Sequence, residues 1–171
     1  MQVDVSKVLL HPREAFALSL SVPLEDQSFG GETVRFQTPA RLEGTMHYTG
    51  KVLLLSAKLT CQAILPCARC LEPVSVPLEA EVEEEFARQE DPAHPDRYLL
   101  DGFTLDVTEM AVQNLLMQLP IAALCRDDCK GLCPICGENL NVNRCSCPQE
   151  GDATEHPFSA LKQWKPQDEE V

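Results

Sequence analysis

Apolar and polar residues alternate along much of the first half of the chain, and this pattern predicts a β-rich fold. Short strands are expected over residues 1–5 and 15–23, because every second residue from position 16 to position 22 is apolar. Residues 27–32, which contain Gly30 and Gly31, are expected to form a loop. The chain should therefore begin with two short strands and a turn.

Three longer extended segments follow, over residues 33–48, 51–65 and 73–86, and they are rich in Val, Leu and Thr. Thr49 and Gly50 separate the first two segments by a length that suits a hairpin. In the third segment apolar residues alternate with serine and glutamate, so one face should be buried and the other acidic and solvated. Together the three segments predict an antiparallel β-meander.

One long helix is expected to follow the sheet. Asp106 is a favourable N-cap, and Glu109, three residues later, would complete a capping box. Apolar residues recur at helical spacing between positions 107 and 119, and Pro120 would end the helix. This apolar stripe predicts that the helix packs on the sheet.

These elements predict an α+β fold in two parts. Residues 1–124 would form a domain of sheet and helix, with a mobile linker at about residues 88–98, where prolines and charges cluster. Residues 125–171 would form a cysteine-rich zinc-knuckle segment and a short terminal helix that begins at Pro157. The apolar face of that helix would carry three side chains: Phe158, Leu161 and Trp164.

Charge and composition narrow the possible partners. The 171 residues carry a formal net charge of -13, so the surface as a whole repels phosphate backbones. Contact with RNA would need a locally basic face or a basic protein partner. No apolar run is long enough to cross a bilayer and no signal peptide pattern precedes the first strand, so a cytoplasmic protein with no membrane partner is expected.

The cysteine content points to metal binding. In the reducing cytoplasm nine cysteines favour metal ligation over a disulfide framework. The spacing Cys133-Pro134-Ile135-Cys136-Gly137 is typical of a zinc knuckle, a tight turn that directs two thiolates toward one metal and its backbone amides toward the sulfurs. A second C-x-x-C pair, Cys67 and Cys70, lies between two expected strands, where a hairpin end would expose both sulfurs on one side.

With Cys61 set aside in a strand interior, eight cysteines remain as candidate ligands. They divide into two sets of four: Cys67, Cys70, Cys125 and Cys129, and Cys133, Cys136, Cys145 and Cys147. Four thiolates form a closed shell with no open coordination position, which predicts structural and not catalytic zinc. The first set would join the hairpin end to the segment after the helix, whereas the second is local in the chain.

Another division of the cysteines stays open. One zinc ion could instead be bound by Cys129, Cys133, Cys136 and either Cys145 or Cys147, which would leave Cys67, Cys70 and Cys125 as free thiols. The expected content is therefore one or two zinc ions, and the metal-to-protein ratio distinguishes the two divisions. An iron–sulfur cluster also accepts four cysteines, but the knuckle spacing favours zinc.

Enzyme signatures are incomplete in this sequence. Cys67 and Cys70 match the P-C-x-x-C half of the zinc deaminase signature, but no histidine supplies the upstream H-x-E half. A thioredoxin-like role requires a cysteine pair at the start of a helix, and this pair lies between antiparallel strands. Rossmann, Walker and G-x-S-x-G motifs are absent. We therefore expect a non-enzyme with no small-molecule substrate.

Taken together, these motifs resemble the YceD-like family, the large ribosomal RNA subunit accumulation proteins. The resemblance covers most of the chain from about Thr33 onward, with the motifs in the same order. It rests on five segments: Pro66-Cys67-Ala68-Arg69-Cys70-Leu71-Glu72-Pro73, Leu105-Asp106-Val107-Thr108-Glu109, Leu119-Pro120, the run from Cys125 through Cys129-Lys130-Gly131-Leu132-Cys133 to Gly137, and Asn139-Leu140-Asn141 with Cys145-Ser146-Cys147.

The resemblance implies a non-catalytic role in the processing or accumulation of 23S ribosomal RNA and thus in the biogenesis of the large ribosomal subunit. The implied partner is ribosomal RNA or a pre-ribosomal particle, contacted directly or through a basic ribosomal protein. Two alternatives come from the residues themselves. Oxidation of the thiolates could make the protein a redox or metal-responsive switch. The acidic face of residues 79–85 could instead serve as an interaction module for a basic ribosomal protein.

Overall fold

The computed structural model describes residues 1–147, so the predicted helix at Pro157 lies outside the described part of the chain. The described elements are, in order, β1 (Gln2–Asp4), α1 (Ser6–Leu10), β2 (Ala15–Val22), β3 (Gln27–Phe29), β4 (Glu32–Phe36), β5 (Ala40–Tyr48), β6 (Val52–Pro66), β7 (Pro73–Ala87), β8 (Tyr98–Leu99), β9 (Thr104–Asp106) and α2 (Thr108–Leu116). The structure is mostly antiparallel sheet, with two short helices in the described residues.

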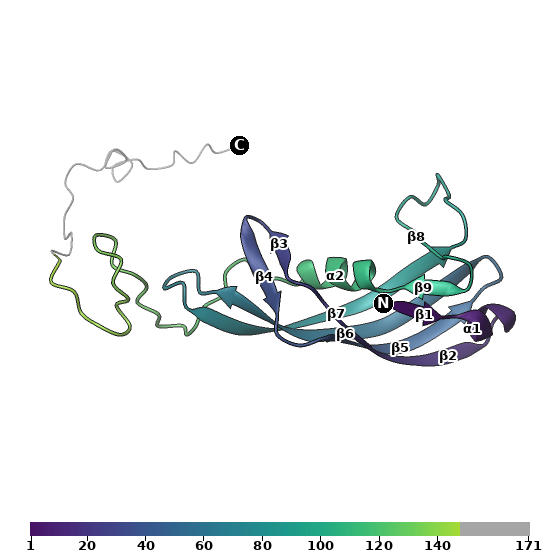
Figure 1. Cartoon of the computed structure of the whole chain (residues 1–171), viewed down its shortest axis with the longest axis horizontal. Helices are drawn as coiled ribbons and strands as arrows, with labels where there is room; N and C mark the ends of the chain where they lie inside the picture. Colours follow the sequence, from purple (N-terminus) through teal and green to yellow (C-terminus); the bar gives the residue numbers. More distant parts are fainter. Residues whose placement is uncertain (148–171) are drawn as a thin grey trace, which may run out of the picture.

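The main sheet is built around β6 and β7, which are 15 residues each and pair along their whole length (Figure 1). β5 pairs with the other side of β6, and β2 pairs with β5, so the sheet order β2-β5-β6-β7 follows the predicted meander. β8 adds a short parallel pairing to the end of β7. β1 and β9, which are far apart in the sequence, form a separate two-stranded sheet.

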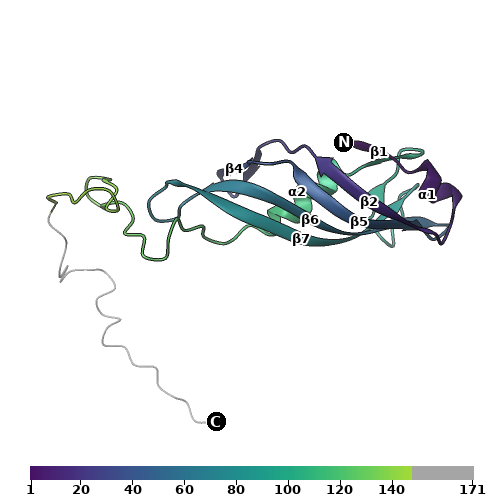
Figure 2. The same cartoon turned by 90° about the horizontal axis from the view of Figure 1, so that it is seen from below.

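The core lies on one face of the main sheet. α2 contacts β6 and β7 on this face (Figure 1). Seen from below, β2, β5, β6 and β7 lie side by side with α2 behind them (Figure 2). The largest fully buried side chains come from the sheet, β9 and α2: Phe86, Leu42, Leu53, Leu55, Leu59, Leu105, Met110 and Leu115. Alternation of apolar and polar residues in the strands thus produces one buried and one solvated face.

The expected continuous strand over residues 33–48 is two strands, β4 and β5, which pair end to end with the same side of β6. The break contains Pro39, whose nitrogen has no hydrogen to donate to a ladder. The Thr38 hydroxyl accepts a hydrogen bond from the backbone N–H of Gln62 at 3.1 Å. A side chain therefore replaces a ladder partner where the strand is interrupted. β3, in the expected loop of residues 27–32, pairs with β4.

The prediction of one long helix is wrong, because α2 has only nine residues. Its C-terminal end tightens into three-residue turns, in which Gln118 donates to the carbonyl of Leu115 and Leu119 to that of Leu116. The predicted capping box does not form, because Val107 is the N-cap residue and makes no side-chain cap hydrogen bond. The Asp106 carboxylate accepts from the backbone N–H of Thr108 at 2.8 Å, whereas Glu109 accepts from the Gln113 amide at 3.2 Å.

Ion pairs connect the expected linker at residues 88–98 to β7 and across its own loop. Arg97 lies between the carboxylates of Glu85 and Asp91, and its side chain is only 21 % exposed. Tyr98 then enters β8 and stacks on Phe86 at a ring-centroid distance of 5.4 Å. Within residues 1–147, no helix is both long and apolar enough to span a membrane.

Candidate metal centre

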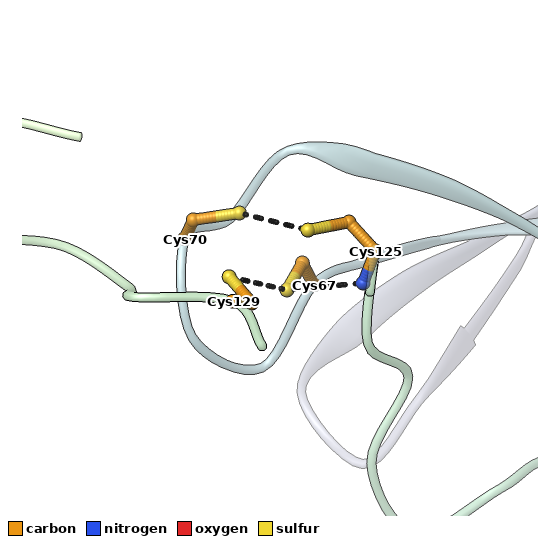
Figure 3. Close-up of side chains that lie close together, drawn as sticks. All are labelled: Cys67, Cys70, Cys125 and Cys129. Atoms are coloured by element: carbon orange, nitrogen blue, oxygen red, sulfur yellow. Dashed lines mark hydrogen bonds between the residues drawn. The ribbon is translucent and has the colours of Figure 1, made fainter. Parts of the chain in front are cut away.

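The first knuckle, residues 66–72, joins β6 to β7. The backbone N–H of Cys67 donates to the Glu72 carbonyl at 2.8 Å, and the N–H of Leu71 donates back to the Cys67 carbonyl at 2.9 Å. Leu71 has a left-handed backbone with φ of 63°, which is uncommon for a residue that carries a branched side chain. The tight turn brings the sulfurs of Cys67 and Cys70 to the end of the hairpin (Figure 3).

The second knuckle, residues 132–138, repeats this backbone pattern. Cys133 donates to the Glu138 carbonyl at 2.8 Å, and Gly137 donates to the Cys133 carbonyl at 2.9 Å. Gly137 has φ of 74° and occupies the position that Leu71 holds in the first knuckle. The two turns are therefore equivalent in hydrogen bonding, although only the second has the glycine that the left-handed position favours.

The first cluster consists of the two cysteines of the first knuckle together with Cys125 and Cys129 (Figure 3). The Cys67 and Cys129 sulfurs are 3.9 Å apart, the Cys70 and Cys125 sulfurs are 3.6 Å apart, and all four lie within 4.8 Å of one another. Four sulfurs placed tetrahedrally at about 2.3 Å from a zinc ion would be about 3.8 Å apart. The distances between the sulfurs therefore fit four ligands placed tetrahedrally around one metal ion, and they are much too long for disulfide bonds.

The second cluster consists of Cys133, Cys136, Cys145 and Cys147, whose ligand atoms also lie within 4.8 Å of one another. Cys136 is exposed, and Cys145 and Cys147 are half-buried, so this cluster lies closer to solvent than the first. In the first cluster three of the four cysteines are buried. The chain can thus hold a metal ion at two separate places, one between elements and one within a single loop.

Backbone amides favour the thiolate form of one cysteine in the first knuckle. The N–H groups of Cys70, Arg69 and Cys125 donate to the Cys67 sulfur and lower the pKa of this thiol to about 6. Burial and the neighbouring sulfurs raise the pKa of Cys125 to about 12. The two values move apart because negative charges this close together repel one another.

The second knuckle shows the same division. The N–H groups of Cys136 and Ile135 lower the pKa of Cys133 to about 6. Hydrogen bonding with Cys136, together with burial, raises the pKa of Cys147 to about 12. A divalent cation in each cluster would offset the repulsion and allow all four thiols to ionise, which is the form that binds zinc.

Asn141 connects the loop of the second cluster to the first cluster. Its amide nitrogen donates to the Cys129 sulfur at 3.3 Å, and its amide oxygen accepts from the backbone N–H of Lys130 at 2.9 Å. The same oxygen accepts from the Arg126 guanidinium at 2.6 Å. Burial opposes ionisation of Cys129, but hydrogen bonds from the Gly131 N–H and from Asn141 leave the pKa of this thiol lowered. Asn141 is therefore a positioning residue for the first cluster.

Arg69 fastens the cysteine-rich segment to the hairpin. Its guanidinium donates to the carbonyls of Asp127 and Cys129, each at 3.0 Å, and its own carbonyl accepts from the N–H of Leu132 at 3.1 Å. Gly131 has φ of 74°, and a Cβ atom there would lie 3.0 Å from the Arg69 carbonyl oxygen. The loop between the clusters therefore approaches the first knuckle closely, and this approach suits a glycine.

Replacing Asn141 by alanine is expected to weaken metal binding by the first cluster about 10- to 100-fold, which is the usual cost of losing a side chain that orients a ligand. The second cluster should keep its affinity, because Asn141 donates to Cys129 and not to the second set of sulfurs. Competition with a coloured chelator would measure both affinities. Asn143→Ala is the matched control, since Asn143 donates to the exposed Glu138 carboxylate. Equal losses in the two variants would contradict the role given to Asn141.

The eight cysteines predicted as ligands form two clusters of four, which are the two sets expected from the sequence. Cys129 lies with Cys67, Cys70 and Cys125, and not with Cys133 and Cys136 as the other division requires. Cys61 faces the core from β6, 7 % exposed, and burial raises its pKa to about 11. The geometry brings the sulfurs together, while their ligation of zinc stays a prediction.

Several basic residues that could contact RNA are engaged within the protein. Arg41 pairs with Glu43, Lys58 with Glu79, and Arg126 with Asp128. Arg69 is bound to carbonyl groups, as described above. Four basic side chains of the sheet and of the cysteine-rich segment are therefore already engaged within the protein.

Comparison with known proteins places this arrangement in a family. The family described as "Large ribosomal RNA subunit accumulation protein YceD" matches residues 55–165, a stretch that contains most of β6, all of β7 and α2, and both cysteine clusters. The chain belongs to the YceD family. The match confirms the resemblance drawn from the cysteine spacings and from the segments around them.

Two relatives illustrate how far the similarity extends. "Uncharacterized protein YlbN" of Bacillus subtilis is 24% identical over 134 residues, which is 77% of this chain and 78% of YlbN. "Large ribosomal RNA subunit accumulation protein YCED homolog 1, chloroplastic" of Arabidopsis thaliana is 35% identical over 46 residues, 27% of this chain and 14% of that protein. No solved structure matches the chain significantly.

Proposed function

We propose that this YceD family protein is a non-catalytic, zinc-binding factor that supports the processing and accumulation of 23S ribosomal RNA and thereby the biogenesis of the large ribosomal subunit. The observation that carries this proposal is the family match over residues 55–165. The name of the Arabidopsis relative refers to the same process. We expect the partner to be a pre-ribosomal particle, contacted through its RNA or through a basic ribosomal protein.

Depletion of the protein tests this role in cells. Precursors of 23S ribosomal RNA should accumulate, and free 50S subunits should fall relative to 30S subunits, when the protein is removed from its own host. Expression of the intact chain should restore both. Normal 23S maturation and normal subunit ratios after complete depletion would reject the proposal.

Zinc is the metal that best suits the two clusters. Each offers four cysteine sulfurs and no other ligand, which is the donor set of closed structural zinc sites. Elemental analysis of purified protein should give two zinc ions per chain, and the solution should be colourless. A ratio of one would leave one cluster without zinc, and a brown solution with iron and sulfide would indicate iron–sulfur chemistry.

The same donor set supports a structural and non-catalytic role for the metals. With four protein ligands no coordination position remains for a substrate or an activated water. The clusters would instead hold the cysteine-rich segment in a fixed shape against the hairpin end. The metal ions would then fix the shape of the surface that contacts the pre-ribosomal particle, without taking part in the contact themselves.

Contact through a basic protein is favoured by the charge of the exposed sheet face. Glu81 and Glu83 are exposed there, and the whole chain carries a net charge of -13. Direct binding of RNA by a set of free lysines and arginines would weaken steeply as salt rises, because bound counterions are released. We expect purified protein to bind naked 23S fragments weakly. Pull-down of ribosomal proteins should survive nuclease treatment; its loss after nuclease would favour direct RNA binding.

A further inference from the structure

The main sheet has two long edges that lack a neighbouring strand among residues 1–147. On one side β2 pairs with β5 alone, from Ala15 opposite His47 to Val22 opposite Ala40. On the other side β7 pairs with β8 only at Phe86 and Ala87, so the rest of its outer edge is open. Each edge presents backbone N–H and C=O groups that can pair with another strand.

The two edges differ in the features that prevent strands from pairing. β7 has proline at positions 73 and 77 and carries Glu79, Glu81, Glu83, Glu84 and Glu85. Proline removes hydrogen-bond donors, and a row of like charges opposes the approach of another strand. The β7 edge is therefore protected by its own sequence.

The β2 edge has none of this protection. Its eight residues, AFALSLSV, include no charged residue and no proline. Ala17, Ser19 and Ser21 are exposed small residues on the solvated face, while Phe16 and Leu20 are half-buried on the core side. No hydrogen bond from the described residues reaches the β2 backbone from outside its ladder with β5. A strand of this length that carries no charge is suited to pairing.

We propose that β2 is the dimerisation edge of this protein, where a second copy of the chain adds its own β2 in antiparallel orientation about a two-fold axis. In an antiparallel pair, side chains directly opposite one another lie on the same side of the sheet. An exposed residue of β2 must therefore lie opposite an exposed residue of the second copy, and this holds only when the two-fold axis passes through a residue and not between two residues. An axis at Ser19 pairs residues 16–22 of one copy with the same seven residues of the other and leaves Ala15 opposite Pro23, just beyond the strand. It places Leu18 opposite Leu20 of the second copy and continues the apolar layer from one sheet into the next.

The charges that flank β2 fit this register. Arg13 precedes the strand, Glu25 follows it, and both are exposed. With Ser19 at the axis, position 13 of one copy is level with position 25 of the other, so each end of the pairing brings an arginine near a glutamate. Neither side chain forms an ion pair within residues 1–147. A second copy therefore matches this edge in apolar pattern, length and charge.

The net charge sets the conditions for association. Two copies carry -13 each and repel one another at long range, whereas the paired strands themselves are uncharged. Salt screens this repulsion within about 10 Å at 0.1 M. The dimer is therefore expected to become tighter as salt rises, which is the opposite of the response of an interface made from ion pairs alone.

Sedimentation velocity of the full, metal-loaded chain over about a hundredfold range of concentration tests the proposal. Wild-type protein should be a reversible dimer. In the register centred on Ser19, position 17 lies opposite position 21 of the second copy. The variant A17K/S21K then places lysine opposite lysine twice, and the dissociation constant should rise at least about tenfold. The variant A17K/S21E places lysine opposite glutamate twice and should keep the dimer.

The two double variants serve as matched controls for each other, because they share one substitution and both change exposed positions of β2. Thermal unfolding of each, below the dissociation constant, shows whether the monomer is intact. A wild-type chain that stays monomeric at the highest concentration would overturn the proposal, whether the edge is free or covered by another part of the chain. A dimer that A17K/S21K leaves unchanged uses another surface and would overturn it equally.

Discussion

Replacing Cys67 by serine is expected to release one of the two metal ions and to detach residues 125–147 from the end of the hairpin. Cys67 is fully buried and accepts hydrogen bonds from three backbone amides, so its sulfur is the best-oriented donor of the first cluster. Structural zinc contributes about 10–16 kcal/mol of binding free energy in small zinc domains. Losing this ion should therefore free the segment, while the main sheet keeps its own apolar core.

Elemental analysis and hydrogen exchange measure this outcome together. Zinc should fall from two ions to one per chain, and amides of residues 125–132 should lose protection while those of β6 and β7 keep it. Cys61→Ala is the matched control, because Cys61 is buried in the sheet outside both clusters and its loss should leave two ions bound. Cys145→Ser should release the other ion without exposing the first knuckle. Two ions retained in Cys67→Ser would contradict ligation by Cys67.

Local spacing explains why the cysteine clusters could be predicted from sequence. Each knuckle is a turn of a few residues that the C-x-x-C spacing marks in the sequence, and the second knuckle also has the glycine that such a turn favours. The two sets of four cysteines could be predicted once Cys67 and Cys70 were placed at the end of a hairpin. That placement followed from the Val-, Leu- and Thr-rich segments on both sides of the pair, which form strands that pair over 15 residues each.

Features that depend on contacts between distant segments were missed. The break between β4 and β5 is bridged by Thr38 and Gln62, which are 24 positions apart in the sequence. α2 ends at Leu116 although apolar spacing continues to Leu119, because tertiary contact and not periodicity decides where a helix stops. Asn141 could have been suspected from its place between the cysteine pairs, but its bond to Cys129 is visible only in the folded loop.

Gly44 lies where the backbone of β6 leaves no room for a side chain on β5. It lies opposite Ala57 on β6 and Leu18 on β2, in the centre of the sheet. A Cβ atom at this position would lie well inside contact distance of the Ser56 carbonyl oxygen and of the Ala57 Cα and Cβ atoms. Two of these three atoms belong to the backbone, so a rotamer change cannot relieve the overlap. The glycine is therefore required by the spacing of the strands and not by its conformational freedom.

Substituting alanine for Gly44 is expected to reduce the free energy of unfolding by about 3 kcal/mol, the upper part of the range for overpacked interiors, because β5 or β6 must shift to admit one methyl group. Urea unfolding of the zinc-loaded protein measures the loss. Thr45→Ala is the matched control, since it places alanine at the next, exposed position of β5 and should change stability little. The double variant G44A/A57G should not recover stability, because the Ser56 carbonyl and the Ala57 Cα remain in the way. Recovery in that variant would mean that the Ala57 side chain, and not the backbone of β6, sets the limit.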